Sequence, residues 1–322
     1  MKVKVGFIGT GGIANTHIQR LAKIEDVKLV SFCDIVKGKA ENSAKKYGAN
    51  SYINYEEMLD KEKLDAVYIC LPPFAHTNQE ILVCEKKINI FVEKPIALSE
   101  EKASQINEAV KKSGVISSVG YMYRYSDIVN KAKKETNNKR IALLLGYYLC
   151  PMPGVSWWRV KNESGGQIVE QTTHIFDTAR YLAGDVDKVY ARGFKGLMKE
   201  VENYSVDDAS SVILQFKNGA IGNISSTCIL SKNWNSGMEV IIKGTRIQLL
   251  LSQNILRITN EKEEEIKTKV DPYLIEDEVF IEAVKSGDPR KIKSPYSDAL
   301  KTLRITLAAN ASIEKGEIIN LD

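Results

Sequence analysis

The chain has 322 residues, enough for about two domains of roughly 150 residues each and for a sizeable buried core. Apolar residues make up 43% and charged residues 27%, which is typical of a folded globular protein and excludes a disordered, collagen-like or solenoid chain. Lys and Arg total 45 and Asp and Glu total 41, and the resulting net charge of +4 is scattered along the sequence. We therefore expect no nucleic-acid partner.

The cysteine content indicates neither a disulfide framework nor a metal centre. The five cysteines are odd in number and widely spaced, without a CxxC pair: Cys33, Cys70, Cys84, Cys150 and Cys228. We expect them to be small apolar residues in a reducing compartment, and we expect no metal. The most apolar stretch of the second half, residues 141–150, is well short of the roughly 20 residues that a membrane helix needs. The sequence thus predicts a cytoplasmic protein with no membrane partner.

The first 120 residues alternate short apolar runs with longer amphipathic stretches. The predicted strands are rich in β-branched residues and span residues 3–8, 27–33, 66–71, 88–92 and 115–119. Predicted helices lie between them, at residues 13–24, 37–47, 75–86 and 99–112. Continuous apolar strands are typical of a sheet that is buried on both faces, and the alternation predicts βαβ units. We expect residues 1–120 to form an α/β domain with a doubly wound parallel sheet.

The pattern changes after Gly120. One predicted helix, at residues 166–182, is followed by strand candidates at residues 186–194, 209–216, 220–227, 237–242, 248–251 and 255–258. Lys217, Asn218 and Gly219 form a turn between two of these strands, which indicates an antiparallel meander. Helices return at residues 275–285 and about 298–314, and the last should pack back on the fold. We expect residues 121–322 to form an α+β domain with an open, mainly antiparallel sheet.

A glycine-rich turn follows the first predicted strand and opens the first predicted helix. Its sequence, residues 9–14, reads GTGGIA and matches a GxGxxA pattern. Gly9 allows a tight turn, Gly11 lets backbone amides approach a pyrophosphate, and Ala14 lets the helix pack closely on the strand. The helix N-terminus adds unpaired N–H groups and the positive end of a dipole. This placement predicts a Rossmann dinucleotide site that includes Gly9, Gly11, Gly12 and Ile13.

Asp34 stands at the end of the second predicted strand, 25 residues after Gly9. A carboxylate at this position accepts hydrogen bonds from the hydroxyls of the adenosine ribose and repels a 2′-phosphate. The sequence therefore favours NAD over NADP. A strand-end Asp that only caps the next turn is the alternative.

Two further segments follow predicted strands of the first domain. Leu71 and Pro72 end one strand, and His76 follows shortly after. Prolines at a strand end stop pairing and direct the chain across the crevice where cofactors bind in open sheets. Glu93 and Lys94 follow the next strand and place charges at the same edge. These five residues are candidate cofactor contacts, with a packing role for His76 and a solvated surface position for Lys94 as alternatives.

The predicted helix at residues 166–182 carries a polar stripe. Glu170, His174 and Asp177 are spaced i, i+4 and i+7, so they should share one helix face. The chain has three histidines, and His174 with a carboxylate one turn away is a candidate general base. A histidine satisfied in the core is the alternative.

In this order along the chain, the motifs resemble the Gfo/Idh/MocA family. The residues that carry the resemblance are Gly9, Gly11 and Ala14, then Asp34, Glu93-Lys94-Pro95, Gly120 with Arg124, Trp158-Arg159, and His174. The resemblance implies an NAD(P)-dependent oxidoreductase that acts on secondary alcohols of sugars, sugar derivatives or cyclitols. It also implies that Lys94 and His174 lie in the active site. The second domain would then bind the substrate and mediate assembly into a homodimer or homotetramer.

The helix before His174 departs from the family pattern. The family usually carries DxGxH, whereas this chain has Glu170, Thr172 and His174 at these positions. The longer acid keeps a carboxylate but moves it by one methylene, and threonine narrows the space beside the helix. The substrate is therefore not copied from the best-known members. Glu170 has two possible roles, which are to orient the His174 imidazole or to accept a substrate hydroxyl.

Further substrate contacts are expected from side chains that recognise sugars. The indole of Trp158 can stack on a sugar ring, and the guanidinium of Arg159 can donate to two hydroxyls. The remaining candidates are Tyr121, Arg124, Gln171 and Asp177. A core position for Trp158 and a packing role for Tyr121 are the alternatives.

The expected reaction moves a hydride between the nicotinamide of NAD and a secondary alcohol carbon. His174, with an unperturbed pKa of about 6.5, suits a general base, and Lys94 can stabilise negative charge that develops on oxygen. Two other functions stay open at this point. One is a glycosidase that uses bound NAD for transient oxidation, and the other is a non-catalytic sensor that binds a dinucleotide.

Overall fold

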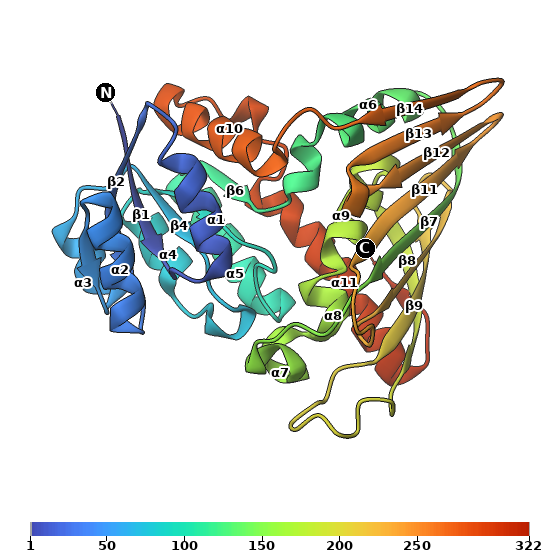
Figure 1. Ribbon diagram of the computed structural model, residues 1–322, viewed down its shortest axis with the longest axis horizontal. Helices are drawn as coiled ribbons and strands as arrows, with labels where there is room; N and C mark the ends of the chain where they lie inside the picture. Colours follow the sequence, from blue (N-terminus) through green and yellow to red (C-terminus); the bar gives the residue numbers. More distant parts are fainter. Residues whose placement is uncertain (1, 322) are drawn as a thin grey trace. The chain divides into compact units, whose positions relative to one another are not determined.

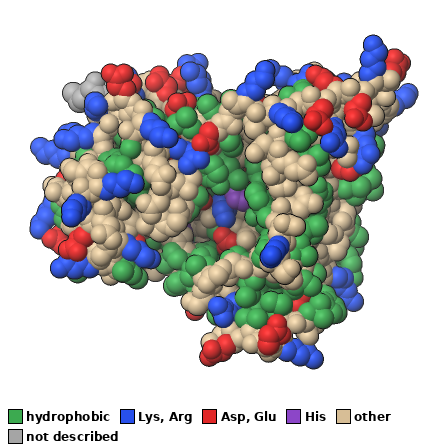
Figure 2. Space-filling view, in the orientation of Figure 1, with side chains coloured by type: hydrophobic (Ala, Val, Ile, Leu, Met, Phe, Trp, Pro, Cys, Tyr) green, Lys and Arg blue, Asp and Glu red, His purple; other side chains and the backbone are tan. Residues whose placement is uncertain are grey.

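A computed structural model describes residues 2–321 of the chain, which divide into two compact units. The first unit contains residues 1–97, 101–125 and 271–300, and the second contains residues 98–100, 126–270 and 301–322. In the part of the chain that the structure describes, no helix is both long and apolar enough to cross a lipid bilayer. Side chains of both charges are interspersed over the face shown in Figure 2, without a broad patch of one sign.

The first unit is built on a six-stranded sheet in which every neighbouring pair of strands is parallel (Figure 1). The strand order is β3-β2-β1-β4-β5-β6. The strands are β1 (Val3–Ile8), β2 (Val27–Cys33), β3 (Asn50–Tyr52), β4 (Ala66–Ile69), β5 (Asn89–Val92) and β6 (Ser117–Val119). The doubly wound parallel sheet predicted from the apolar runs is thus confirmed. The edge strand β3 was missed because its three residues are polar or partly exposed.

Five helices described in the first unit connect these strands in sequence, and a sixth comes late in the chain. They are α1 (Gly12–Leu21), α2 (Lys37–Tyr47), α3 (Tyr55–Lys61), α4 (Gln79–Glu85), α5 (Glu100–Ser113) and, late in the chain, α10 (Pro272–Ser286). Three short 3₁₀ turns, η1 (Pro73–Ala75), η2 (Met122–Tyr125) and η5 (Pro289–Lys291), complete the unit. The helix expected from residue 75 begins at Gln79 instead. There the Gln79 side-chain oxygen accepts from the Thr77 amide and holds the preceding residues in a turn.

The position of α10 changes the expected domain boundary. Phe280 and Ile281 of α10 are buried in the same apolar cluster as Val5 and Phe7 of β1. Burial of this helix face removes apolar surface from water, so α10 belongs to the first unit although about 150 residues separate it from the rest. The division expected at residue 120 therefore differs from the observed one, which adds residues 121–125 and 271–300 to the first unit.

The second unit is built on a nine-stranded sheet with the order β14-β13-β12-β11-β7-β10-β9-β8-β15. The strands are β7 (Ile141–Leu149), β8 (Val186–Phe194), β9 (Ala209–Phe216), β10 (Ile221–Thr227), β11 (Asn235–Ile242), β12 (Thr245–Leu250), β13 (Ile255–Thr259), β14 (Glu263–Lys267) and β15 (Ile319–Asn320). One pair, β7 with β10, is parallel, and the other seven pairs are antiparallel. The mainly antiparallel sheet expected for this half is confirmed.

Four shorter helices are described in the second unit. They are α6 (Asp127–Thr136), α7 (Lys161–Ser164), α8 (Gly166–Glu170) and α9 (Thr173–Ala183), with the turns η3 (Ser156–Arg159) and η4 (Leu251–Gln253). Three of them, α6, α8 and α9, contact strands of this sheet, and α7 contacts α8. The last helix, α11 (Tyr296–Lys315), contributes residues 296–300 to the first unit and the rest to the second. Leu144 on β7 and Ile224 on β10 are buried. Leu145, which alternates with Leu144, is exposed.

The single helix expected at residues 166–182 is wrong, because the chain breaks it between Glu170 and Thr173. The amide of Thr172 donates to the carbonyl of Gln167, five residues back, so the α-helical pattern is lost there. Side chains on both sides of the break are tied to the sheet. Gln167 donates to the Thr227 carbonyl at 2.8 Å, and Gln171 accepts from the Cys150 thiol at 3.3 Å. These tertiary contacts explain why periodicity alone did not reveal the break.

Candidate active site

Residues predicted to bind a cofactor gather at one edge of the parallel sheet. The glycine turn follows β1, Asp34 follows β2, Leu71 and Pro72 follow β4, and Lys94 follows β5. Parallel pairing in register brings these strand ends to the same edge. The carboxyl edge of such a sheet is where open α/β folds bind their ligands.

The glycine turn leaves the space that a dinucleotide pyrophosphate requires. Gly9 has a φ of +87°, and a Cβ there would lie 2.2 Å from the Cys70 carbonyl oxygen, so the turn needs glycine. A Cβ at Gly11 or Gly12 would meet no protein atom within 4 Å. Helix α1 begins at Gly12, so its first amides and its positive dipole end face this open space. The residues present therefore fit a bound dinucleotide.

Asp34, predicted to bind the ribose hydroxyls, also makes hydrogen bonds within the protein. Its Oδ2 accepts from the Thr10 amide at 2.9 Å and from the Thr10 hydroxyl at 3.0 Å, and its Oδ1 accepts from the Val36 amide at 2.9 Å. A carboxylate offers about four acceptor positions, so these contacts leave room for one further donor such as a ribose hydroxyl. Asp34 thus fixes the glycine turn to the end of β2 and keeps acceptor capacity at the sheet edge.

Glu93 and Lys94 point to different surroundings although they are adjacent. The Glu93 side chain is buried, and its Oε2 accepts from the Lys94 backbone amide at 3.0 Å. Its Oε1 lies 2.9 Å from Nε2 of His17 on α1. A Cβ at Gly120 would lie 2.5 Å from this Oε1, so glycine at that position leaves room for the carboxylate. Glu93 is therefore held by contacts within the unit, whereas Lys94 is half-buried at the edge.

The His76 side chain likewise contacts residues within the first unit. It is buried, its Nδ1 is hydrogen-bonded to Glu80 of α4, and its Nε2 lies 3.4 Å from the Leu71 carbonyl oxygen. Arg124 is also buried, where its Nη1 donates to the Lys293 carbonyl at 2.5 Å and pairs with Asp298 at 2.5 Å. Tyr121 is 1% exposed. The structure thus places these three candidates in the packing of the first unit.

In the second unit, Trp158 and Glu170 form a hydrogen-bonded pair. The Trp158 indole is 1% exposed and packs with Cys150, Val206 and Cys228. Its Nε1 donates to Glu170 Oε2 at 2.8 Å. The indole therefore occupies the core position that was the alternative to sugar stacking. Because helix α8 ends at Glu170 and α9 begins at Thr173, Glu170 and His174 do not share one continuous helix, as their predicted spacing assumed.

His174 and Asp177 both lie on α9 but serve different surroundings. His174 is in the first turn of the helix and 8% exposed. Asp177 is buried, and its Oδ1 accepts from the Thr302 hydroxyl of α11 at 2.9 Å. Arg159 of η3 and Gln171 are half-buried. The Nε atom of Arg159 is buried and has no hydrogen-bond partner among residues 2–321.

Sequence reasoning missed two residues that contact the predicted site. His17 lies on α1, one turn after the glycine pattern, and Asp277 lies on α10. The ring of His17 bridges the two carboxylates, with its Nδ1 2.7 Å from Asp277 Oδ1. A histidine among the apolar residues of α1 was a visible signal, because only three histidines occur in the chain. Asp277 had no such signal.

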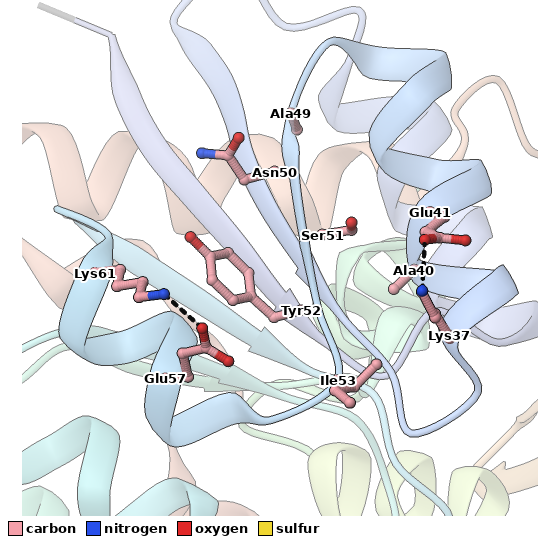
Figure 3. A pocket seen from close by; sticks show the side chains of 10 residues that line it. All are labelled: Lys37, Ala40, Glu41, Ala49, Asn50, Ser51, Tyr52, Ile53, Glu57 and Lys61. Atoms are coloured by element: carbon pink, nitrogen blue, oxygen red, sulfur yellow. Dashed lines mark hydrogen bonds and ion pairs between the residues drawn. The ribbon is translucent and has the colours of Figure 1, made fainter.

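An open pocket of about 650 Å³ lies elsewhere on the first unit, beside the edge strand β3. Figure 3 shows Tyr52 between two ion pairs, Lys37 with Glu41 and Lys61 with Glu57. Each pair connects residues four apart on one helix. The cations are therefore neutralised locally, and no predicted site residue lines this pocket.

A parallel sheet with a glycine turn at its carboxyl edge defines a dinucleotide-binding protein of the Rossmann class. The oxidoreductase family described as having an NAD-binding Rossmann fold matches residues 3–121, and the GFO/IDH/MocA C-terminal domain matches residues 140–249. The chain therefore belongs to the GFO/IDH/MocA family of oxidoreductases.

Known proteins resemble the chain over its whole length. Myo-inositol 2-dehydrogenase of Thermotoga maritima is 27% identical over 335 residues, covering 99% of this chain and 99% of that protein. The scyllo-inositol 2-dehydrogenase (NAD(+)) of Bacillus subtilis is 28% identical over 338 residues, covering 100% and 97%. A levoglucosan dehydrogenase structure in complex with NADH and levoglucosan aligns with a TM-score of 0.90 at 20% identity, covering 99% of each chain. This structural likeness shows the fold.

Substitutions at Gly9 and Gly11 should have different effects on protein stability and on cofactor binding. Gly11→Ala should leave the stability of the free protein unchanged and weaken NADH binding about tenfold or more, because the methyl group enters the space of the pyrophosphate. Gly9→Ala should in addition destabilise the protein by about 1–3 kcal/mol, because of its positive φ. Thermal unfolding and NADH fluorescence titration measure both effects.

Gly38→Ala provides the matched control, since a Cβ at Gly38 on α2 also meets no atom within 4 Å. It should change neither NADH affinity nor the unfolding temperature appreciably. Wild-type NADH affinity in Gly11→Ala would contradict the assignment of the turn.

Proposed function

We propose that this NAD-dependent oxidoreductase interconverts a secondary alcohol and a ketone on a sugar, sugar derivative or cyclitol. The observation that carries the proposal is the carboxyl edge of the parallel sheet, where the open glycine turn, Asp34 and Lys94 meet. The inositol dehydrogenases that resemble the chain over its whole length support a polyol substrate. The Glu170 and Thr172 positions depart from the family pattern, so the particular polyol is not transferred from these relatives.

The proposed mechanism divides the work between two side chains. When bound, NAD⁺ would supply the hydride acceptor: the alcohol carbon loses a hydride, which carries two electrons, and the alcohol oxygen loses a proton. His174 accepts this proton as general base through a ring nitrogen. Lys94 stabilises the negative charge that develops on the alcohol oxygen. The half-buried Arg159, with its unpartnered Nε, donates to a further substrate hydroxyl.

Glu170 contributes to this site as a fixed carboxylate. The Trp158 indole N–H holds its Oε2, and the indole itself is packed in the core. Such a side chain loses little conformational freedom when it binds a ligand. We infer that Glu170 keeps its direction in the free protein and that Trp158 is its positioning residue.

A panel of cyclitols and sugars, assayed for NADH formation, tests the proposed reaction directly. Net NADH formation with at least one polyol supports it. Hydrolysis of a glycoside without net NADH formation would indicate the NAD-dependent glycosidase, and binding of NADH without turnover of any member would indicate the sensor.

Catalytic roles should separate in the kinetics of two variants. His174→Ala should lower kcat by about 10²- to 10⁴-fold, because the alcohol loses its base, and should leave the Kd for NADH nearly unchanged. Lys94→Ala should lower kcat and also weaken NADH binding. Stopped-flow hydride transfer and NADH titration measure these quantities, and near-normal turnover of His174→Ala would remove this residue from the mechanism.

Asp34 should set the preference for NAD over NADP. Asp34→Asn retains one side-chain oxygen to accept from Thr10 or Val36 but removes the negative charge that repels a 2′-phosphate. We expect weaker NADH binding and a narrower gap between the Kd values for NADH and NADPH. A wild-type protein that binds NADPH more tightly than NADH would overturn this assignment.

We also infer a homodimer or homotetramer that assembles through the sheet of the second unit. Leu145, Ile213 and Ile221 are 40%, 53% and 54% exposed, and their register on β7, β9 and β10 places them on one face. Ile213→Lys together with Ile221→Lys should shift the mass measured by light scattering toward the monomer. Ile53→Lys, at a similarly exposed isoleucine of the first unit, is the control. A wild-type monomer would contradict the proposal.

The proposed location is the cytoplasm. All five cysteines are free and buried, which supports a protein that folds in a reducing compartment.

A further inference from the structure

A cluster of ionisable side chains in the interior of the first unit has no part in the mechanism described so far. His17, Glu93 and Asp277 come from α1, the end of β5 and α10, and their side chains are 0%, 3% and 0% exposed. The His17 ring lies between the two carboxylates, 2.9 Å from Glu93 Oε1 and 2.7 Å from Asp277 Oδ1. The Tyr68 hydroxyl donates to the same Asp277 oxygen at 3.1 Å.

With both carboxylates ionised, this arrangement requires a proton on each ring nitrogen. A neutral imidazole has one N–H, so it could donate to one carboxylate and would present a lone pair to the other. An imidazolium donates to both and supplies the positive charge that a buried carboxylate needs. Burial lowers the pKa of His17, but Asp277 and Glu93 together outweigh it and raise the pKa to about 10.

The bridge reaches the backbone of Lys94 through Glu93. One Glu93 oxygen contacts His17, and the other accepts from the Lys94 amide. Gly120 borders the same carboxylate so closely that a Cβ would overlap it. The Glu93 side chain is therefore confined on three sides, and its position fixes the backbone nitrogen of Lys94.

We propose that His17 is a positioning residue which, as a buried imidazolium held by Asp277, fixes Glu93 and thereby Lys94 at the edge of the sheet. The inference rests on the proposed function of Lys94. It also assigns a role to α10, which supplies the anchoring carboxylate although Asp277 follows Lys94 by 183 residues.

Other ionisable groups surround this bridge on each element that packs against it. Arg20 of α1 pairs with Asp271 and lies over the Tyr273 ring, and this ring in turn contacts the His17 ring at 6.0 Å between centroids. Further groups are Tyr68 of β4, Cys70 directly after β4, and Glu276 of α10. Burial raises the pKa of Tyr68, Cys70 and Tyr273, so these groups are neutral at physiological pH.

A double-mutant cycle on His17 and Glu93 tests the proposal. His17→Gln keeps a hydrogen-bond donor but removes the positive charge that lies between the two buried carboxylates, so the contact that holds Glu93 is weakened. We expect kcat for polyol oxidation to fall roughly 10- to 100-fold through misplacement of Lys94. In the double variant His17→Gln/Glu93→Gln, kcat should fall little further than in His17→Gln, because the two residues act on Lys94 through the same contact.

Ile18→Ala is the matched control for loss of stability. Ile18 is the next residue of α1, fully buried in the apolar core and uncharged. This variant should lower the unfolding temperature while its kcat and pH profile stay at the wild-type values. Equal loss of kcat in Ile18→Ala and His17→Gln, or independent and additive effects of His17→Gln and Glu93→Gln, would overturn the proposal.

Two further measurements do not depend on turnover. In the wild-type protein labelled at histidine, ring ¹⁵N NMR should show the His17 ring as an imidazolium at pH 8, and that signal should be absent from His17→Gln. A neutral His17 would overturn the proposal even where the variant does not fold. Acetylation of Lys94 by acetic anhydride, followed by mass spectrometry and normalised to Lys61, should become severalfold faster in His17→Gln and remain unchanged in Ile18→Ala.

These measurements distinguish a failure of the proposed function from a failure of the positioning role of His17. A wild-type protein that oxidises no polyol would defeat the proposed function, while the NMR signal and the Lys94 acetylation rate would still decide whether His17 positions Lys94. Unchanged acetylation of Lys94 in folded His17→Gln would defeat the positioning role whatever the substrate.

Discussion

Parallel pairing is the constraint on which the arrangement of this protein depends. Six strands that run in the same direction must each be followed by a connection that returns to the opposite edge, so their carboxyl ends share one edge. The glycine turn, Asp34 and Lys94 are separated in sequence, and the parallel sheet brings them to that edge. Two carboxylates connect the ends of these strands to neighbouring elements. The Asp34 carboxylate ties the end of β2 to the glycine turn, and the Glu93 carboxylate ties the end of β5 to α1.

The fold could be predicted where burial imposes a pattern on the sequence. Strands β1 and β2 are buried along most of their length, and their apolar runs gave their observed limits. Strands β3 and β14 could not be found in this way. The first reads NSY and the second EEEIK, and both form because a neighbouring strand offers unpaired backbone groups. Helix α10 was predicted as a helix, but nothing in its sequence indicated that its apolar face packs in the same core as β1.

The candidate site shows the same difference between local and tertiary information. The glycine turn was predictable because its residues act through their own backbone conformation. The spacing argument for Glu170 and His174 depended on an unbroken helix, and contacts of Gln167 and Gln171 with distant residues break it. Likewise, the sequence presented Trp158 as a surface for a sugar ring, whereas Val206 and Cys228 enclose it in the core. Residues that act through long-range partners could be named as candidates, but their partners could not.

The ends of the nine-stranded sheet determine how it can interact with other strands. An open sheet has two edges whose backbone groups invite pairing with another chain. At one edge, β14 carries Glu263, Glu264, Glu265 and Lys267, and charged side chains of this kind disfavour the addition of a flat apolar strand. At the other, the two residues of β15 pair with Lys188 and Val189 in the first half of β8. Residues 319–321 thus cover the beginning of this nine-residue strand, and their removal would extend the open edge along the whole of β8, where another strand could add.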